Sequence, residues 1–209
     1  LGMEIYNGVI GRLDGSSYAL DKWDRLLSEG RRIWGFANDD SHQGTQEVEL
    51  GWNVAYVKQR TVRGVVDALR TGRFYGSTGV TIKSIQVEGT RVRIETQDAH
   101  RIIGICNVGK RFAVVDEPIL EVTVPATARY VRFECWGCGE RIAWTQPFFV
   151  EEEPTAPASR SFLEEWHVSA LLEEATLSKA IHSQTANLAM TPIRCHSARD
   201  RIFGLVDLR

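Results

Sequence analysis

The middle of the chain, residues 80–150, consists of short runs rich in β-branched and aromatic residues, separated by Gly, Pro, Asp and Asn. In the clearest of these runs Val131, Phe133 and Cys135 alternate with two charged residues. A period of two is typical of a strand, and closely spaced turn residues are typical of antiparallel sheets. The region therefore predicts a small antiparallel β-sandwich of about six or seven strands.

Residues 1–79 have a different pattern, in which short apolar runs alternate with segments of helical period. Strands are predicted at MEIY and RRIWGFAN, and helices at ALDKWDRLLSEG and TVRGVVDALRTG. Thr61 is the expected N-cap of the second helix, and Gly30 and Gly72 are the expected ends of the two helices. Strand, helix, strand, helix is the order of a parallel α/β unit. Because two strands are too few for such a sheet, we expect further strands upstream of Leu1.

The last part of the chain, residues 151–209, opens with a charged connection that contains Pro and Ala, EEEPTAPASR. Ser161 and Glu164 have the spacing of a capping box, and the apolar residues around them predict a helix that docks on another surface. Three parts are thus expected: an α/β part at 1–79, a β-sandwich at 80–150, and a linker with a helical tail. The pattern does not decide whether this tail contacts its own core or a neighbouring chain.

The composition narrows the range of partners. Of the 209 residues 43% are hydrophobic and 25% are charged, which is ordinary for a soluble globular protein. A formal net charge of -2 and the lack of a basic block argue against a nucleic-acid partner. No apolar run approaches the roughly 20 residues of a membrane helix, and the first residues lack the positive charge of a signal peptide. We therefore predict a cytoplasmic protein with no membrane partner.

The four cysteines include one pair with the spacing of a metal or redox site, Cys135 and Cys138 in CWGC. A closed zinc site needs two such pairs, or one pair and two histidines, and no second pair exists. In the alternative interpretation Cys135 packs inward from a strand, while Cys138 lies in a tight turn before Gly139. We prefer this alternative, because a closed zinc site demands four ligands, and reduced thiols are the usual state inside cells.

The segment WGFANDDSHQG places several ligand-capable side chains directly after an apolar run. Asn, Asp and Ser are common turn formers, so the segment can simply close a loop. Alternatively, Asp40 and His42 face one cation, because residues two apart in an extended segment point the same way. A carboxylate with an imidazole suits zinc, manganese or iron better than calcium, and Asn38 and Asp39 would then hold the turn. Two ligands do not complete a site, so the spacing leaves both interpretations open.

Four segments, GMEIYN, LDKWDRLLSEGRRIWGFANDDSH, GWNVAYV and ALRTGRFYGSTG, together resemble a known family. They look like the C-terminal part of a PHP-family metal-dependent phosphoesterase, a family named for its polymerase and histidinol phosphatase members. The resemblance covers about residues 1–150 of this sequence. It implies a fold of the class α/β plus all-β, in which the terminal strands and helices of a distorted (β/α)7 barrel precede the β-sandwich and the helical tail.

The same resemblance implies an activity. Asp40 and His42 match the last metal-binding motif of the family, Asp-x-His, and would be both metal ligands and catalytic residues. The implied cofactors are divalent ions (Mn, Zn or Fe), and the implied reaction is the hydrolysis of a small phosphorylated substrate by metal-activated water. Glu4 and Asn7 match a strand whose polar residues lie near that site, and for Glu4 we expect a structural role at the strand end.

The sequence also departs from the family pattern. The His-x-His motif of the family is absent, no histidine precedes His42, and the other four histidines match no family motif. A hydrolase of this kind would therefore need a separate N-terminal half or a homo-oligomer to complete its site. The alternative is a non-catalytic binding or interaction module that uses the β-rich domain and the helical tail.

Overall fold

The computed structural model describes residues 2–13, 15–42, 45–150 and 191–195. The chain divides into one unit of residues 1–150 with 190–209, and residues 151–189, which lie outside the described residues. The strands are β1 (Gly2–Asn7), β2 (Trp34–Asn38), β3 (Trp52–Val57), β4 (Phe74–Ser77), β5 (Ile82–Glu88), β6 (Arg91–Thr96), β7 (Ala99–Cys106), β8 (Lys110–Val115), β9 (Ile119–Thr123), β10 (Tyr130–Gly137), β11 (Ile142–Thr145), β12 (Phe148–Phe149) and β13 (Thr191–Cys195). The helices are α1 (Leu20–Ser28) and α2 (Val62–Arg70), with short 3-10 turns η1 (Ile10–Arg12) and η2 (Thr45–Glu47).

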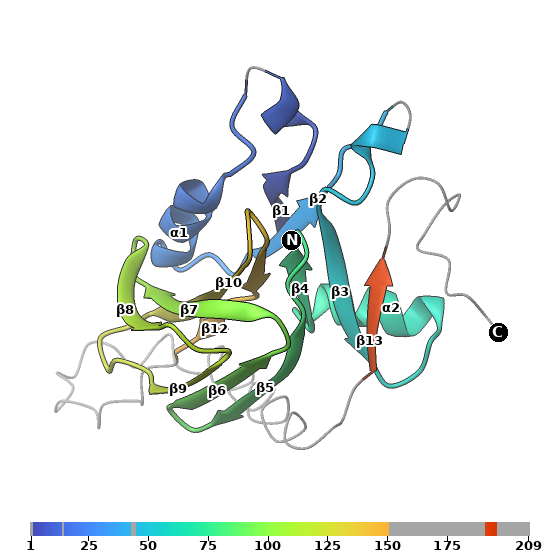
Figure 1. Ribbon diagram of the computed structural model, residues 1–209. Coiled ribbons are helices and arrows are strands. Elements are labelled where there is room, and N and C mark those ends of the chain that lie inside the picture. Colours follow the sequence, from blue (N-terminus) through green and yellow to red (C-terminus); the bar gives the residue numbers. More distant parts are fainter. Residues whose placement is uncertain (1, 14, 43–44, 151–190, 196–209) are drawn as a thin grey trace, which may run out of the picture. The chain divides into compact units, whose positions relative to one another are not determined.

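The first elements, β1, α1 and β2, form a parallel unit (Figure 1). In α1 the apolar side chains Trp23 and Leu27 lie one turn apart and are buried, which explains why this segment is a helix that packs. Gly30 follows α1 with φ +84, and its amide donates to the carbonyl of Leu27. This left-handed glycine ends the helix as the sequence predicts. The predicted strand, helix and strand are confirmed here.

The predicted barrel is wrong. The described residues are mostly β-strands with only two α-helices, and no (β/α)7 barrel is present among them. The physical reason lies at the outer edge of β2, where side-chain amides take the place of a neighbouring strand. Asn53 bonds both the amide and the carbonyl of Ala37, and Gln146 does the same for Gly35. Because these backbone groups are already satisfied, no third parallel strand is added there.

The strands after β2 form an antiparallel sheet instead. The eight-stranded sheet has the order β13-β3-β4-β11-β10-β7-β8, with β12 paired to β10. Helix α2 packs against β3, and its predicted N-cap Thr61 accepts a hydrogen bond from the amide of Gly64 at 3.0 Å. Along the sequence, α2 connects β3 to β4, and these two strands pair antiparallel rather than parallel.

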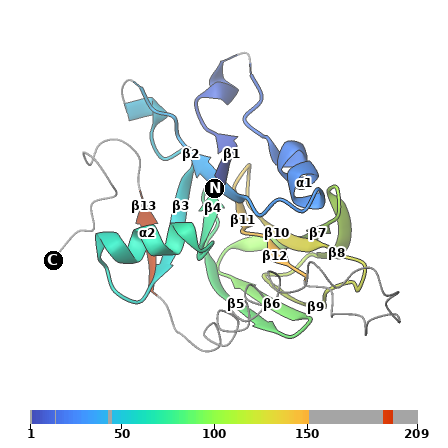
Figure 2. The same cartoon turned by 180° about the vertical axis from the view of Figure 1, so that it is seen from behind.

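The main core lies between this sheet and the three-stranded antiparallel sheet β5-β6-β9 (Figure 2). Ile82, Ile94 and Leu120 of the small sheet and Val131 and Phe133 of the large sheet belong to one buried cluster. Two antiparallel sheets around a common core make a sandwich. The large sheet includes β3 and β4 from the first 79 residues, and the domain boundary after residue 79 stays a prediction. The predicted helices of the tail lie outside the described residues, and the described segment after residue 150 is the strand β13.

Strand β10 has both faces buried. Val131, Phe133 and Cys135 are fully buried on the sandwich side, which confirms the predicted alternation. The charged face is buried as well, because Arg132 is only 1% exposed and Glu134 only 6% exposed. The alternation of apolar and charged residues therefore located the strand correctly. The face that carries the charged residues is nevertheless buried inside the protein.

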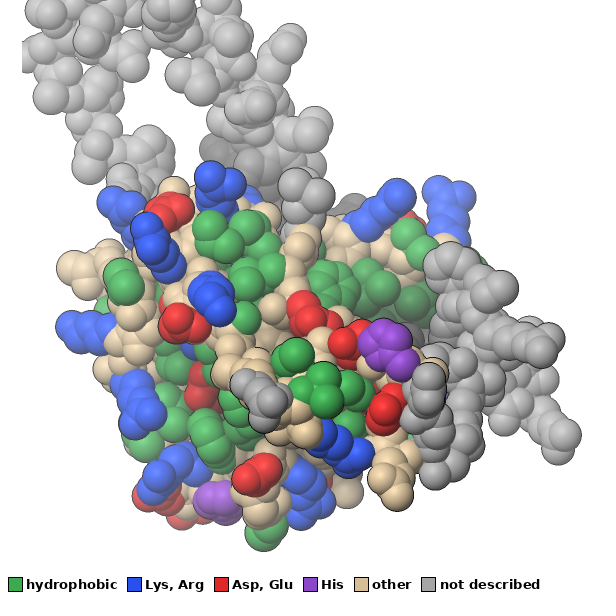
Figure 3. All heavy atoms as spheres, turned by 90° about the horizontal axis from the view of Figure 1, so that it is seen from above, with side chains coloured by type: hydrophobic (Ala, Val, Ile, Leu, Met, Phe, Trp, Pro, Cys, Tyr) green, Lys and Arg blue, Asp and Glu red, His purple; other side chains and the backbone are tan. Residues whose placement is uncertain are grey.

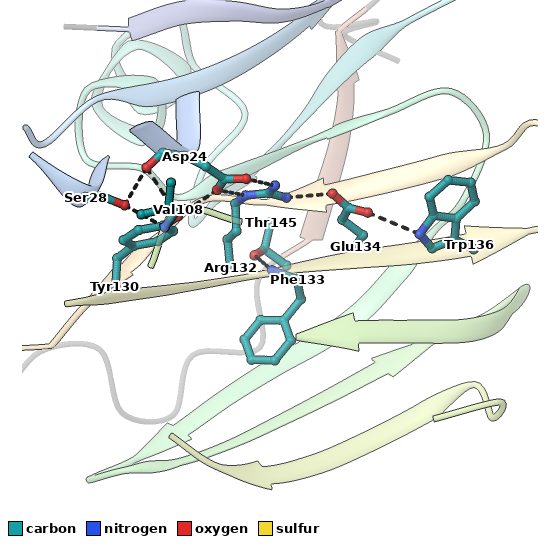
Figure 4. Close-up of polar contacts among 9 residues, drawn as sticks. All are labelled: Asp24, Ser28, Val108, Tyr130, Arg132, Phe133, Glu134, Trp136 and Thr145. Carbon is teal, nitrogen blue, oxygen red and sulfur yellow. Dashed lines mark hydrogen bonds and ion pairs between the residues drawn. The ribbon is translucent and has the colours of Figure 1, made fainter. Parts of the chain in front are cut away.

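An ion-pair cluster of Asp24, Tyr130, Arg132 and Glu134 joins α1 to this charged face (Figure 4). The guanidinium of Arg132 donates to both carboxylate oxygens of Asp24, at 2.7 and 2.6 Å, and to Glu134 Oε1 at 2.8 Å. The Tyr130 hydroxyl donates to Asp24 Oδ1 at 2.8 Å. Burial, together with the negative charge and the hydrogen bond of Asp24, raises the pKa of Tyr130 to about 12. Each charge in this α1 ion-pair cluster depends on its partners, because an unpaired buried charge is strongly unfavourable.

Candidate metal site at the strand ends

A group of polar side chains gathers where β1 and β2 end. Because the two strands are parallel, their carboxyl ends meet at one edge, and Asn7 of β1 lies opposite Asn38 of β2. The strand-end cluster consists of Glu4, Asn7, Asn38, Asp40 and His42. Figure 3 views the molecule from this end, and acidic side chains lie next to a histidine on the surface that it shows.

Neutral amides hold the carboxylates of this cluster. Asn7 Nδ2 donates to Glu4 Oε2 at 3.1 Å and to Asp40 Oδ2 at 3.0 Å, so one amide bridges two carboxylates. Asn38 Nδ2 donates to the other oxygen of Glu4 at 2.9 Å. Neutral donors orient a carboxylate without neutralising it, so negative charge is concentrated at the strand ends.

The two sequence-predicted ligands lie together. His42 Nε2 is 3.9 Å from Asp40 Oδ1, and the two side chains are 71% and 45% exposed. Two ligands of one zinc ion lie about 3–3.5 Å apart, because each metal–ligand bond is about 2.1 Å long. A shift of less than about 1 Å would therefore bring this pair to coordination distance. The oxygen of Asp40 that faces His42 is not the one bonded to Asn7.

Asp39 fixes the turn that presents Asp40. Its side chain is buried, and its carboxylate accepts the backbone amides of Leu50 at 2.7 Å, Gly51 at 2.8 Å and Glu49 at 3.1 Å. Asp40 itself has φ +59, a left-handed conformation that Asp adopts more readily than most residues. The predicted role of Asp39 in holding this turn is confirmed by these three hydrogen bonds. The turn and the metal interpretations are therefore compatible, since different residues serve each.

The donor set is incomplete within the part of the chain that the structure describes. No group of three or more His, Cys, Asp or Glu side chains that could hold a metal ion occurs there. Both oxygens of Glu4 accept amide hydrogen bonds, and Glu47 Oε2 accepts the backbone amide of His42 at 2.7 Å. The role of Glu47 was not foreseen, because a contact to a backbone amide leaves no signature in the sequence. Asp40 and His42 thus stay two candidate ligands, and a metal site would need further ligands beside them.

Other candidate positions lie away from the strand ends. Cys135 is fully buried in the sandwich core, while Cys138 is exposed beside Gly139 with φ +69, so the two thiols do not form a zinc pair. Burial raises the pKa of the Cys135 thiol far above its usual value, which makes it an inert core residue.

Comparisons with known proteins give no further indication of function. No family model matches the chain, and neither the curated proteins nor the solved structures contain a match. Among the described residues, no helix is long and apolar enough to cross a membrane. The chemistry of the strand-end cluster is therefore the main evidence about what the protein does.

Proposed function

We propose that Asp40 and His42 bind a divalent cation and that this cation serves in the hydrolysis of a phosphate ester. The observation that supports the proposal best is the 3.9 Å separation of Asp40 Oδ1 and His42 Nε2 at the carboxyl end of a parallel strand pair. The resemblance of four segments to PHP-family phosphoesterases supplies the reaction class. Carboxylate and imidazole together favour zinc, manganese or iron.

The charge of the cluster gives the cation a definite role. Glu4 and Asp40 are held by neutral amides, so a phosphorylated substrate that approaches them meets negative charge. A bound divalent ion would offset this repulsion, contact the phosphoryl oxygens and lower the pKa of a water molecule. Asn7 keeps one oxygen of Asp40 occupied and thereby leaves the other oriented toward His42. Because the phosphate is repelled until the cation is bound, we expect the cation to bind first and the phosphorylated substrate second.

The remaining ligands would come from outside the described residues. A separate N-terminal half or a second copy of the chain is the partner that we propose, with a small phosphorylated compound as substrate. Cytoplasmic location and the lack of a nucleic-acid partner stay predictions.

The second candidate is a binding or interaction module without catalysis. It is favoured by one observation, namely that the described residues supply only two candidate ligands. The two candidates differ in one measurable property, because only the first requires a cation at Asp40 and His42.

Isothermal titration of the purified chain with Mn²⁺ and Zn²⁺ tests the proposal. We expect saturable binding that weakens at least about tenfold in Asp40→Asn and in His42→Gln, since each variant removes one ligand. Glu88→Gln is the matched control, because it removes an exposed carboxylate on β5. Equal binding by the wild-type chain and the Asp40→Asn/His42→Gln double variant would reject the metal site and favour the interaction module.

Hydrolysis of p-nitrophenyl phosphate is the second measurement. We expect turnover only when the missing ligands are present, and it should depend on Asp40 and His42 in that assembly. Turnover that persists in the double variant would show that the reaction takes place elsewhere.

A further inference from the structure

The outer edge of β3 is occupied by a short strand from a distant part of the sequence. β13 pairs antiparallel with β3 over five positions, from Thr191 opposite Val57 to Cys195 opposite Asn53. On its other side β3 pairs with β4, so β13 is the last strand of the eight-stranded sheet (Figure 1). Without β13, one edge of β3 would present unpaired backbone groups, which invite another strand.

The hydrogen-bonding pattern of this edge follows from one measured contact. The amide of Tyr56 donates to the carbonyl of Arg73 at 2.8 Å, so the backbone groups of Tyr56 face β4. Successive residues of a strand direct their backbone groups to opposite sides. The backbone groups of Asn53, Ala55 and Val57 therefore face β13.

The proline in β13 matches this pattern. Pro192 lies opposite Tyr56, so its nitrogen is directed away from β3, where the lack of an N–H removes no bond to β3. Ile193 lies opposite Ala55, and its backbone groups are directed toward β3. A proline at the outward position also discourages a further strand from pairing with β13. The segment is thus suited to be a single, terminal strand.

The connection that leads to β13 is long. About forty residues separate β12 from β13 in the sequence, far more than the few residues that usually join paired strands. Closing so long a connection loses more chain entropy than closing a tight hairpin. In return, β13 gains backbone hydrogen bonds to β3 alone, because it is the last strand of the sheet. Such a strand competes with any other extended segment that offers the same backbone pattern.

We propose that the outer edge of β3 is a strand-binding surface, and that residues 191–195 of the same chain occupy it as an exchangeable ligand. The surface accepts an extended segment in antiparallel orientation with three inward-facing residues, opposite Asn53, Ala55 and Val57. A proline is tolerated only where the occupant's backbone faces away from β3. The inference is independent of the cation at the strand ends, since it rests on backbone pairing alone.

Two proline substitutions in the full chain test the surface directly. Ile193→Pro removes an N–H that faces β3, whereas Arg194→Pro removes one that faces away, so the second is the matched control. We expect amide exchange of Ala55 and Val57 to accelerate at least about tenfold in Ile193→Pro. The amides of Val54 and Tyr56, which face β4, should stay protected in both variants. Equal exchange at Ala55 and Val57 in the wild-type chain and in Ile193→Pro would overturn the proposal.

A peptide tests the exchange. The probe is a labelled peptide of residues 189–197 with Cys195→Ser, followed by fluorescence anisotropy. We expect it to bind the Ile193→Pro chain at least about tenfold more tightly than the wild-type chain, because the intramolecular competitor is weakened. The same peptide with Ile193→Pro should not bind. A peptide that fails to bind the Ile193→Pro chain, or that binds both chains equally, would refute an exchangeable occupant.

Discussion

The α1 ion-pair cluster, which joins α1 to β10, and the strand-end cluster, which lies where β1 and β2 end, differ in how their charges are compensated. In the first, one guanidinium, that of Arg132, forms ion pairs with both Asp24 and Glu134 in the interior. In the second, amide groups orient Glu4 and Asp40 near the surface, and no arginine or lysine is among their hydrogen-bond partners described here. Identical side chains therefore serve stability in one place and remain available for a ligand in the other.

Solvent accounts for the difference. A buried carboxylate without a cation is strongly destabilising, so the interior selects pairs whose oxygens are all used. An exposed carboxylate is stabilised by water, so an excess of negative charge persists there at little expense in stability. This comparison predicts that substitution destabilises the α1 ion-pair cluster far more than the strand-end cluster, and that added metal stabilises only the strand-end cluster.

The largest effect is expected for Arg132→Met. The substitution leaves the carboxylates of Asp24 and Glu134 buried without their cation and should lower the free energy of unfolding by about 3–5 kcal/mol. Urea unfolding followed by tryptophan fluorescence measures it. Arg25→Ala on the same helix breaks an exposed pair with Glu29 and should change stability by about 0.3–0.5 kcal/mol. Similar losses of unfolding free energy in the two variants would contradict the claim that a buried ion pair matters more than an exposed one.

A smaller effect is expected from alkaline pH at Tyr130. Its pKa is raised to about 12 in the folded protein and is about 10 in the unfolded chain, so between these values the folded state binds more protons. The contribution of Tyr130 to stability is thus fully present below pH 10, and it falls by on the order of 2 kcal/mol as the pH rises to 12. Unfolding measured at pH 9 and pH 11.5 in the wild type and in Tyr130→Phe isolates this contribution. An unchanged slope in Tyr130→Phe would assign the pH dependence to other tyrosines.

Added cation should stabilise the strand-end cluster. At a free Mn²⁺ concentration ten times the dissociation constant, binding to the folded state adds about 1.4 kcal/mol to the free energy of unfolding. Thermal unfolding with and without Mn²⁺ measures the shift. The Asp40→Asn/His42→Gln variant should show none, whereas Arg132→Lys, altered only in the α1 ion-pair cluster, should retain it. Stabilisation of the double variant would place the cation elsewhere.

The smallest effect is expected for Asp40→Asn without metal. The side chain is 45% exposed and its partners are neutral or exposed, so stability should change by less than about 0.5 kcal/mol. The same substitution at Asp24 should be several times more damaging, because it weakens the pair with Arg132. Both variants are compared by urea unfolding at pH 7. Equal losses of stability in Asp40→Asn and Asp24→Asn would show that the two clusters do not differ in how much they stabilise the fold.

Features governed by neighbouring residues could be predicted from the sequence. The ends of α1 and α2 follow from Gly30 and Thr61, and the alternation in β10 marks a real strand. These predictions succeed because the interactions that enforce them lie within one turn or one strand. The turn at Asp39 is different, because the amides that hold its carboxylate belong to Glu49, Leu50 and Gly51, ten to twelve positions away. Asp40 has φ +59, so its proximity to His42 does not come from the extended segment that the spacing predicts.

Features governed by distant residues could not be predicted. The barrel was excluded by Asn53 and Gln146, which bond β2 from 16 and 111 positions away. Arg132 looked like a solvent-facing residue because its partner Asp24 lies 108 positions earlier. A side chain that replaces a neighbouring strand, or one that neutralises a buried charge, gives no periodic signal.

The side-chain amides of Asn53 and Gln146, which hydrogen-bond the edge of β2, can be hydrolysed. Each acts as donor and acceptor at once, and hydrolysis of either amide would leave a carboxylate, which accepts only. Deamidation of Asn53 or Gln146 would therefore set a negative oxygen against the carbonyl of Ala37 or Gly35. The repulsion between these oxygens would loosen β2 from its neighbours and displace the strand ends that it supports. Mass spectrometry would detect the modification as a gain of about one mass unit.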